Sequence, residues 1–166
     1  ANFLVMSQVR KKIKKFKKVK KTFDNEISKK IIKNFDFELT KNQKNVLKEI
    51  NNDVSSDYKM FRLLQGDVGS GKTIVSLIAA ANVIRSSWQV ALMAPTEILA
   101  KQHYNLARKM FKSTNVVVEL ISSKTETKIK KKIYNNLANG KINFLIGTHS
   151  LIQEKIIFKK LGFVII

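Results

Sequence analysis

The chain has 166 residues, the size of one ordinary domain, and 44% of them are apolar, which is enough to bury a core. It has no cysteine and two histidines, so disulfides and cysteine-based zinc sites are excluded, and a metal site made of protein ligands alone is not expected. No apolar run approaches the ~18–20 residues that span a bilayer, so we expect a cytoplasmic protein without a membrane partner.

The net charge of +20 at pH 7 favours a polyanion as the partner. Lysine far outnumbers arginine, however, and asparagine and isoleucine are also plentiful. Such a bias can come from the base composition of a genome, so the charge alone does not establish nucleic-acid binding.

A basic segment opens the chain, with Lys and Arg dominating from Arg10 to Lys21. Apolar residues at steps of three and four predict one helix with an apolar stripe: Val9, Ile13, Phe16 and Val19. Nothing obvious upstream could cover this stripe. We therefore interpret residues 1–35 as a basic helical connector from a preceding, absent domain; the alternative is a nucleic-acid-binding arm.

Residues 36–166 predict helices and strands in alternation. The first helix begins at a Thr-x-x-Gln capping box, Thr40 with Gln43. The elements expected after it are strands at 61–65, 89–94, 116–121, 142–146 and 163–166, and helices at 72–85, 96–111, 125–138 and near 151. Strands that are wholly apolar and alternate with helices predict an α/β fold with a mainly parallel sheet covered on both faces.

The segment Gly66–Thr73 fits G-x-x-x-x-G-K-[ST] at every fixed position. Its glycines allow successive N–H groups to approach a phosphate, and the following helix points its positive end at the anion. Lys72 is expected to reach the β- and γ-phosphates and Thr73 to bind Mg²⁺, which makes these two the candidate catalytic residues. The candidate nucleotide-binding residues are Gly66, Asp67, Val68, Gly69, Ser70, Gly71, Lys72 and Thr73. An ordinary strand–turn–helix with a spare lysine is the alternative.

Three further segments resemble motifs of superfamily-two helicases, in the same order along the chain. Phe37–Thr40 with Gln43 is similar to the segment whose glutamine recognises adenine, a role that can coexist with the capping box. Ala94–Ala100 with Gln102 is similar to the first nucleic-acid-contacting motif, whose alternative is a capped core helix. Gly147–Leu151 is similar to the second. The candidate DNA-contacting residues are Pro95, Thr96, Glu97, Gln102, Gly147, Thr148 and His149.

Four stretches resemble the RecG branch-migration helicases in particular: Arg62–Gln65, Val90–Met93, Gln102–Tyr104 and Gly147–Gln153. Over about residues 37–166, the resemblance implies the first RecA-like half of an ATP-driven motor, a three-layer sandwich that uses ATP and Mg²⁺. It implies remodelling of stalled forks and Holliday junctions in recombination and repair, with backbone contacts to branched or duplex DNA that carry no base specificity. It also implies a monomeric, nucleoid-associated bacterial parent. The alternatives are a transcription-repair coupling translocase or an RNA helicase.

The same resemblance implies parts that the chain does not contain. In RecG-like motors an acidic Asp-Glu-x-His box follows a strand like Phe163–Ile166, and a second half supplies an arginine finger worth about 10³–10⁵ in rate. We therefore expect the domain at 36–166 to be incomplete at its C-terminus and inactive alone. A fragment that binds nucleotide or DNA without turnover is the third interpretation.

Overall fold

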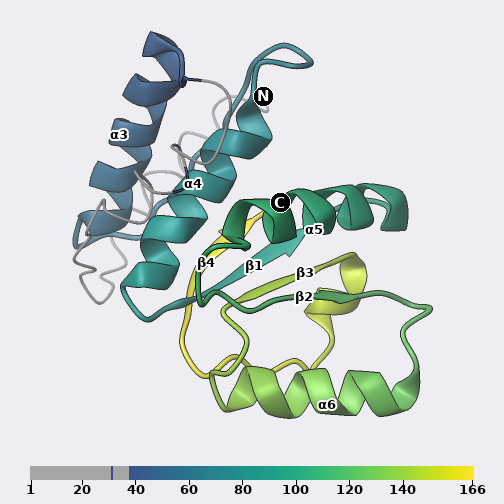
Figure 1. The fold of residues 1–166 in the computed structure, drawn as a ribbon. Helices are drawn as coiled ribbons and strands as arrows, with labels where there is room; N and C mark the ends of the chain where they lie inside the picture. The colour runs from purple at the N-terminus through teal and green to yellow at the C-terminus, as the bar shows by residue number, and fades with distance from the viewer. Residues whose placement is uncertain (1–30, 32–37) are drawn as a thin grey trace, which may run out of the picture.

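The computed structural model describes residue 31 and residues 38–166 (Figure 1). Except for Ile31, the predicted basic connector at 1–35 lies outside the described residues. The elements follow in the order α3 (Lys41–Ser55), α4 (Lys72–Arg85), β1 (Gln89–Met93), α5 (Glu97–Phe111), β2 (Val118–Ile121), α6 (Thr127–Ala138), β3 (Phe144–Gly147), the 3₁₀ helix η1 (His149–Ile152) and β4 (Leu161–Ile165). Within the described ranges, every helix is too short or too polar to cross a membrane.

The described strands form one parallel sheet in the order β2-β3-β1-β4. The registers pair Gly147 at the end of β3 with Met93 of β1 and with Ile121 of β2. The carboxyl ends of these three strands are therefore level, and the loops that leave them begin side by side. The predicted parallel sheet is confirmed.

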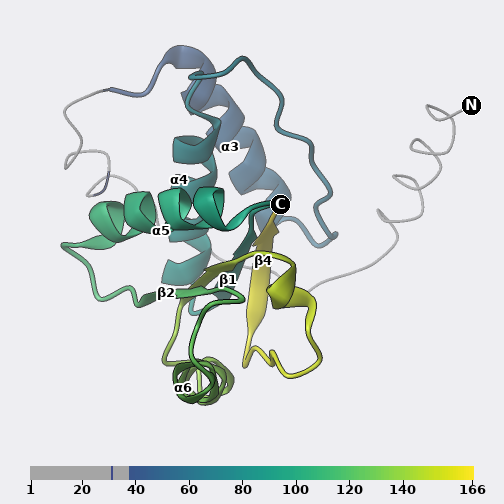
Figure 2. The ribbon, with the colours of Figure 1, turned by 90° about the vertical axis from the view of Figure 1, so that its right-hand side faces the viewer.

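Helices cover both faces of the sheet, as predicted. Figures 1 and 2 show α3, α4 and α5 on one side of the strands and α6 on the other. Successive residues of β3 supply both faces, since strand side chains alternate: Phe144 and Ile146 lie in the larger core, while Leu145 packs with Ile133 and Leu137 of α6. The sandwich therefore has three layers.

The helix starts follow the capping residues that the sequence predicted. The Thr40 side chain accepts from the Gln43 backbone N–H, and the Gln43 side chain accepts from the Thr40 N–H, which completes the capping box. Thr96 accepts from the Leu99 N–H at 3.2 Å and starts α5 directly after Pro95. Both helices therefore begin where the sequence placed them.

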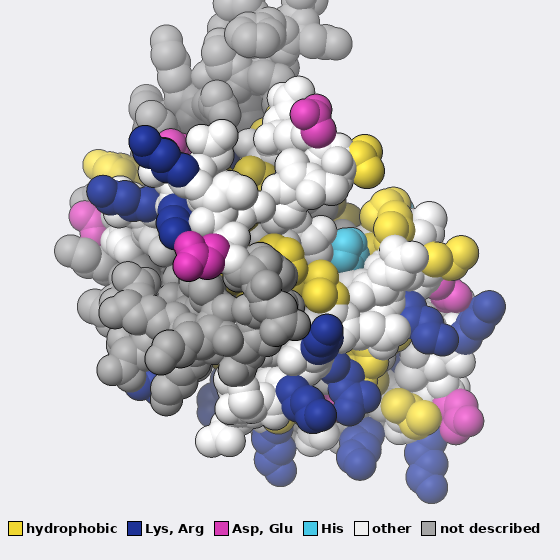
Figure 3. Space-filling view, turned by 45° about the horizontal axis from the view of Figure 1, so that its top comes forward, with side chains coloured by type: hydrophobic (Ala, Val, Ile, Leu, Met, Phe, Trp, Pro, Cys, Tyr) yellow, Lys and Arg dark blue, Asp and Glu magenta, His cyan; other side chains and the backbone are white. Residues whose placement is uncertain are grey.

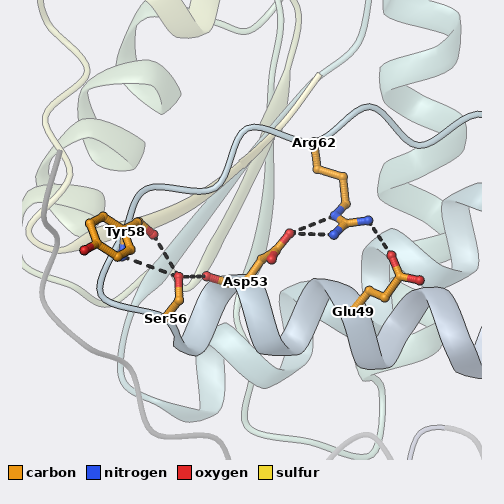
Figure 4. A network of polar contacts seen from close by, with 5 residues as sticks. All are labelled: Glu49, Asp53, Ser56, Tyr58 and Arg62. Carbon is orange, nitrogen blue, oxygen red and sulfur yellow. Dashed lines mark hydrogen bonds and ion pairs between the residues drawn. The ribbon is translucent and has the colours of Figure 1, made fainter. Parts of the chain in front are cut away.

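The predicted buried strand at 61–65 is wrong. These residues form no strand, and the side chains of Phe61 and Leu63 are 62% and 77% exposed. An apolar run becomes a strand only where a neighbour pairs with its backbone, and residues 61–65 pair with none of the strands of the described sheet. The segment instead runs along α3 toward the glycine-rich loop (Figure 4).

Candidate functional site

The glycine-rich loop leads directly into the first turn of α4. Gly69 and Gly71 have φ angles of +81° and +82°, and Gly71 is the residue that precedes the helix. Only residues 86–88 separate the end of α4 from the start of β1, so α4 runs back along the sheet and its N-terminus lies toward the carboxyl ends of the strands. The partial positive charge of a helix N-terminus therefore faces this loop.

The loop is built closely enough to need its glycines. A Cβ on Gly66 would lie 2.9 Å from the Ser70 hydroxyl oxygen, and one on Gly71 would collide with the Gln43 amide nitrogen. The φ near +80° is unfavourable for other residues, so the backbone conformation requires glycine at position 71, and a Cβ there would also displace the Gln43 amide. A loop of this kind exposes backbone N–H groups to an anion without intervening side chains.

Lys72 places its charge inside the loop. Its Nζ donates to the carbonyl oxygens of Gly66 and Asp67, both at 2.6 Å, and lies 3.5 Å from the Ser70 hydroxyl. Thr73 follows it in the first turn of α4 and is half-buried. The cation, the threonine hydroxyl and the helix start are thus close together in the chain, as the motif predicts.

Gln43 joins α3 to the loop. Its side-chain Nε2 donates to the Ser70 carbonyl at 2.9 Å, while its Oε1 accepts from the Thr40 N–H at 2.9 Å. A primary amide has a second N–H and a second lone pair. The residue predicted to recognise adenine therefore lies against the phosphate loop and keeps hydrogen-bonding capacity for a base.

A second group of candidate residues lies where the central strands end. The Ala94 N–H donates to the Gly147 carbonyl at 2.8 Å, so the chain before Pro95 and the chain before Thr148 leave the sheet together. A Cβ on Gly147 would lie 2.6 Å from the Ile121 carbonyl oxygen of the neighbouring strand, so this close approach needs glycine. The structure therefore brings together the two segments that the sequence assigned to nucleic acid.

The other candidates at this edge are accessible. Pro95, Thr96, Gln102 and His149 are exposed, while Glu97 and Thr148 are half-buried. Only Gly147 is buried among them, so we assign it a packing role and not a direct contact.

Glu97 connects this edge to a third loop that the sequence analysis did not single out. Its Oε1 accepts from the Ser123 N–H at 3.1 Å and from the Ser123 hydroxyl at 2.5 Å, and its Oε2 lies 3.8 Å from the Lys124 Nζ. The hydrogen bond from the Ser123 hydroxyl is the largest of several causes that lower the pKa of Glu97 below its usual value. The loop between β2 and α6 therefore belongs to the same surface.

One signal for this loop was present in the sequence. The loops that follow parallel strands share one edge of the sheet, so residues 122–126 after the predicted strand were candidates by position. The resemblance of Arg62–Gln65 to RecG helicases marked Arg62 in the sequence, but no signal predicted the contacts of its guanidinium with Glu49 and Asp53 on α3. Those contacts depend on the path that the chain takes in three dimensions.

The glycine loop, the lysine within it and the helix start behind it, on a parallel three-layer sandwich, define the P-loop class of nucleotide-binding proteins. The DEAD/DEAH box helicase family model matches residues 39–166. The chain belongs to this family, and its similarity to RecG sequences and to a RecG structure supports the RecG type.

The similarity to RecG helicases extends over nearly the whole chain. It is 46% identical to the ATP-dependent DNA helicase RecG of Aquifex aeolicus over 157 residues, which are 95% of this chain and 20% of that protein. It is 48% identical to the Bacillus subtilis RecG over 147 residues, or 89% of this chain and 22% of that protein. The chain thus spans about a fifth of the length of the curated relatives that it matches.

Solved structures agree on the architecture. A structure of RecG bound to a three-way DNA junction has a TM-score of 0.90 and 42% sequence identity, and the match covers 97% of this chain and 22% of that one. A hypothetical ATP-dependent RNA helicase from Sulfolobus tokodaii has a TM-score of 0.58 at 17% identity, with 81% of this chain and 38% of that one covered, which supports the fold alone. The expected RecA-like helicase fold is confirmed.

Proposed function

We propose that this chain carries the nucleotide-binding part of an ATP-dependent DNA helicase of the RecG type. The observation that carries the proposal is the loop at Gly66–Thr73, with Lys72 held inside it and the N-terminus of α4 behind it. Hydrolysis of ATP would drive movement on duplex or branched DNA, in the repair and recombination work that the resemblance implies.

The residues of the loop fit a nucleoside triphosphate. Two glycines of the cradle have the positive φ angles that bring backbone N–H groups toward an anion, and one lysine is positioned to exchange its carbonyl partners for phosphate oxygens. Gln43 would hydrogen-bond the adenine through the capacity its amide retains. The Thr73 hydroxyl would hold Mg²⁺, which, when bound, would neutralise charge that develops on the phosphates.

DNA would contact the edge formed by the loops after β1, β3 and β2. Thr96 and Thr148 offer hydroxyl and backbone groups, and the start of α5 offers free N–H groups, all of which suit phosphates and carry no sequence information. Contacts of this type support binding to DNA of any sequence. The RecG relative whose structure contains a three-way DNA junction supports this choice of partner.

Equilibrium binding of a fluorescent ATP analogue, with and without Mg²⁺, tests the proposal. Lys72→Ala should weaken binding at least tenfold, because the cation that faces the phosphates is lost. Lys141→Ala removes an equal charge at the opposite edge of the sheet and should bind like the unchanged protein. Equal affinities for all three proteins would overturn the assignment of the loop.

Nucleotide binding without turnover is the second candidate. Among the described residues, no acidic side chain is bonded to Lys72 or Thr73, whereas hydrolysis in P-loop motors uses an acid near the metal. DNA-stimulated release of phosphate would establish the motor function. Tight binding without any release would favour the second candidate.

A further inference from the structure

The chain segment that enters the phosphate loop is anchored along the whole of α3. At the C-terminal end of this helix, the Ser56 hydroxyl donates to the Asp53 carbonyl at 2.7 Å and lies 3.2 Å from the Tyr58 carbonyl. At the N-terminal end, Gln43 donates to Ser70. The two anchoring residues, Gln43 and Ser56, are therefore about 20 Å apart along the helix, at 1.5 Å per residue.

Arg62 supplies the anchor between these two ends (Figure 4). Its Nε and one terminal nitrogen contact the Asp53 Oδ2 at 2.9 and 2.7 Å, and its other terminal nitrogen contacts the Glu49 Oε2 at 2.7 Å. The side chain is 30% exposed, so it is partly withdrawn from water. This geometry uses all three nitrogens of the guanidinium and is more specific than an isolated surface ion pair.

The residues around Arg62 alternate in a way that directs it toward α3. Met60 and Leu64 pack against the core, whereas Phe61 and Leu63 are exposed. Arg62 lies between these two apolar neighbours in the sequence and, like them, contacts the rest of the molecule, since its guanidinium reaches α3. The segment is thus fixed by two apolar contacts with one charged contact between them.

The two neighbouring carboxylates on α3 also favour a cation between them. Glu49 and Asp53 are four residues apart on one face of the helix, where like charges destabilise it. The guanidinium between them turns this repulsion into attraction from both sides. The hydrogen bond to the Asp53 side chain has the largest effect on the pKa of Arg62 and raises it. Burial has the next largest effect and lowers it, but the net result is a raised pKa.

We propose that Arg62 is a positioning residue for the phosphate loop, acting through Glu49 and Asp53. It lies four residues before Gly66 and touches neither the loop nor any candidate ligand atom. By holding the entering chain against α3, Arg62 fixes the position and direction of the backbone where the loop begins at Gly66. Gln43 fixes the other end of the loop through its hydrogen bond to Ser70. The inference rests on the proposed nucleotide site.

The test measures the dissociation constant of a fluorescent ATP analogue well below the unfolding temperature. Arg62→Met keeps an unbranched apolar stem as far as the position of Nε and removes the guanidinium, and it should raise the dissociation constant roughly three- to tenfold. Arg62→Lys keeps the charge but loses the three-point geometry, and it should give a smaller increase. The control is Lys48→Met on the exposed side of the same helix, which should leave the affinity unchanged.

A double-mutant cycle separates positioning from a general loss of stability. If Arg62 acts through Asp53, then Asp53→Asn should also weaken binding, and the double variant should bind no worse than Arg62→Met alone. A merely structural role would lower the unfolding temperature of Arg62→Met while its affinity at low temperature stays that of the unchanged protein. That result would overturn the inference. If the unchanged protein itself fails to bind, the proposed function fails first.

Discussion

At the scale of single residues, the phosphate loop depends on backbone shape more than on side chains. Gly71 combines a φ of +82° with a close side-chain neighbour, the Gln43 amide, that a methyl group would displace. Lys72 follows Gly71 directly, and its side chain reaches back into the loop because the backbone turns at Gly71. The glycines of the loop therefore determine its backbone conformation, and this conformation in turn positions the Lys72 ammonium group.

Gly71→Ala should impair nucleotide binding by at least tenfold, because the new Cβ displaces Gln43 and the backbone must leave its left-handed conformation. Gly140→Ala is the matched control: its φ is +75° and its Cβ would lie 3.0 Å from the flexible Lys159 side chain, far from the loop. Isothermal titration with an ATP analogue should find near-normal affinity for the control, whatever stability it loses. Equal loss in both variants would point to general destabilisation.

Glu97 should show a pH dependence of its own. Because its folded-state pKa is lowered, the link to Ser123 contributes stability above the ordinary carboxyl value of 4.5 and is lost as pH falls through the lowered value. The Ser123 amide resonance should therefore titrate below pH 4.5 in an NMR series. In Glu97→Gln this transition should disappear; its persistence would assign it to another group.

At the scale of elements, one buried glutamine joins three segments at the amino-terminal edge of the sheet. Gln89 is 4% exposed, and its Nε2 donates to the carbonyls of Leu137 and Ile142 at 2.9 and 2.7 Å. Its Oε1 accepts from the Lys160 N–H at 2.8 Å. The side chain thus holds the end of α6 and the chains entering β3 and β4 in one place.

Gln89→Leu should lower the free energy of unfolding by about 2–4 kcal/mol, because buried polar groups would lose their partner. Chemical denaturation with urea measures this loss. Gln102→Leu removes an exposed amide from α5 and should change stability by less than about 0.5 kcal/mol. A small effect at Gln89 would mean that water replaces the amide.

The capped helices and the apolar strands were predictable because their information is local. Thr40 with Gln43, and Pro95 with Thr96, mark helix starts within four residues. The strand predicted at 61–65 failed because strand formation depends on a partner elsewhere in the chain. The loop residues 66–73 were predictable as a motif, whereas the contacts of Arg62, nine and thirteen residues from its partners, were not.

At the scale of the whole molecule, the distribution of the positive charge over the surface matters, since the net charge is +20. Lysine and arginine side chains gather along the lower part of the face in Figure 3, and α6 carries several exposed lysines. Lys128, Lys131 and Lys132 are exposed and share one face of this helix, opposite the buried Ile133 and Leu137. They lie in the half of α6 nearer the carboxyl ends of the strands, beside the proposed DNA edge.

Duplex binding should therefore respond to which lysines are removed. Changing Lys128, Lys131 and Lys132 together to Gln should reduce the salt dependence of the binding constant by up to about three units of slope, since each phosphate contact releases about one counterion. Changing Lys109, Lys112 and Lys141 to Gln removes the same charge at the opposite edge and should leave the slope nearly unchanged. Fluorescence anisotropy over a salt series measures both. Equal changes would assign the charge to overall composition.

The burial of α4 has a consequence for motion. This helix is enclosed from Leu77 to Ile84, whereas the loop at its N-terminus is open to solvent. Amide hydrogens in the second half of α4 should exchange with deuterium only when the molecule opens globally, while those of Asp67–Ser70 exchange within moments. The phosphate loop should thus exchange rapidly while the helix that supports it exchanges slowly, so bound nucleotide is expected to slow exchange in the loop without altering that helix.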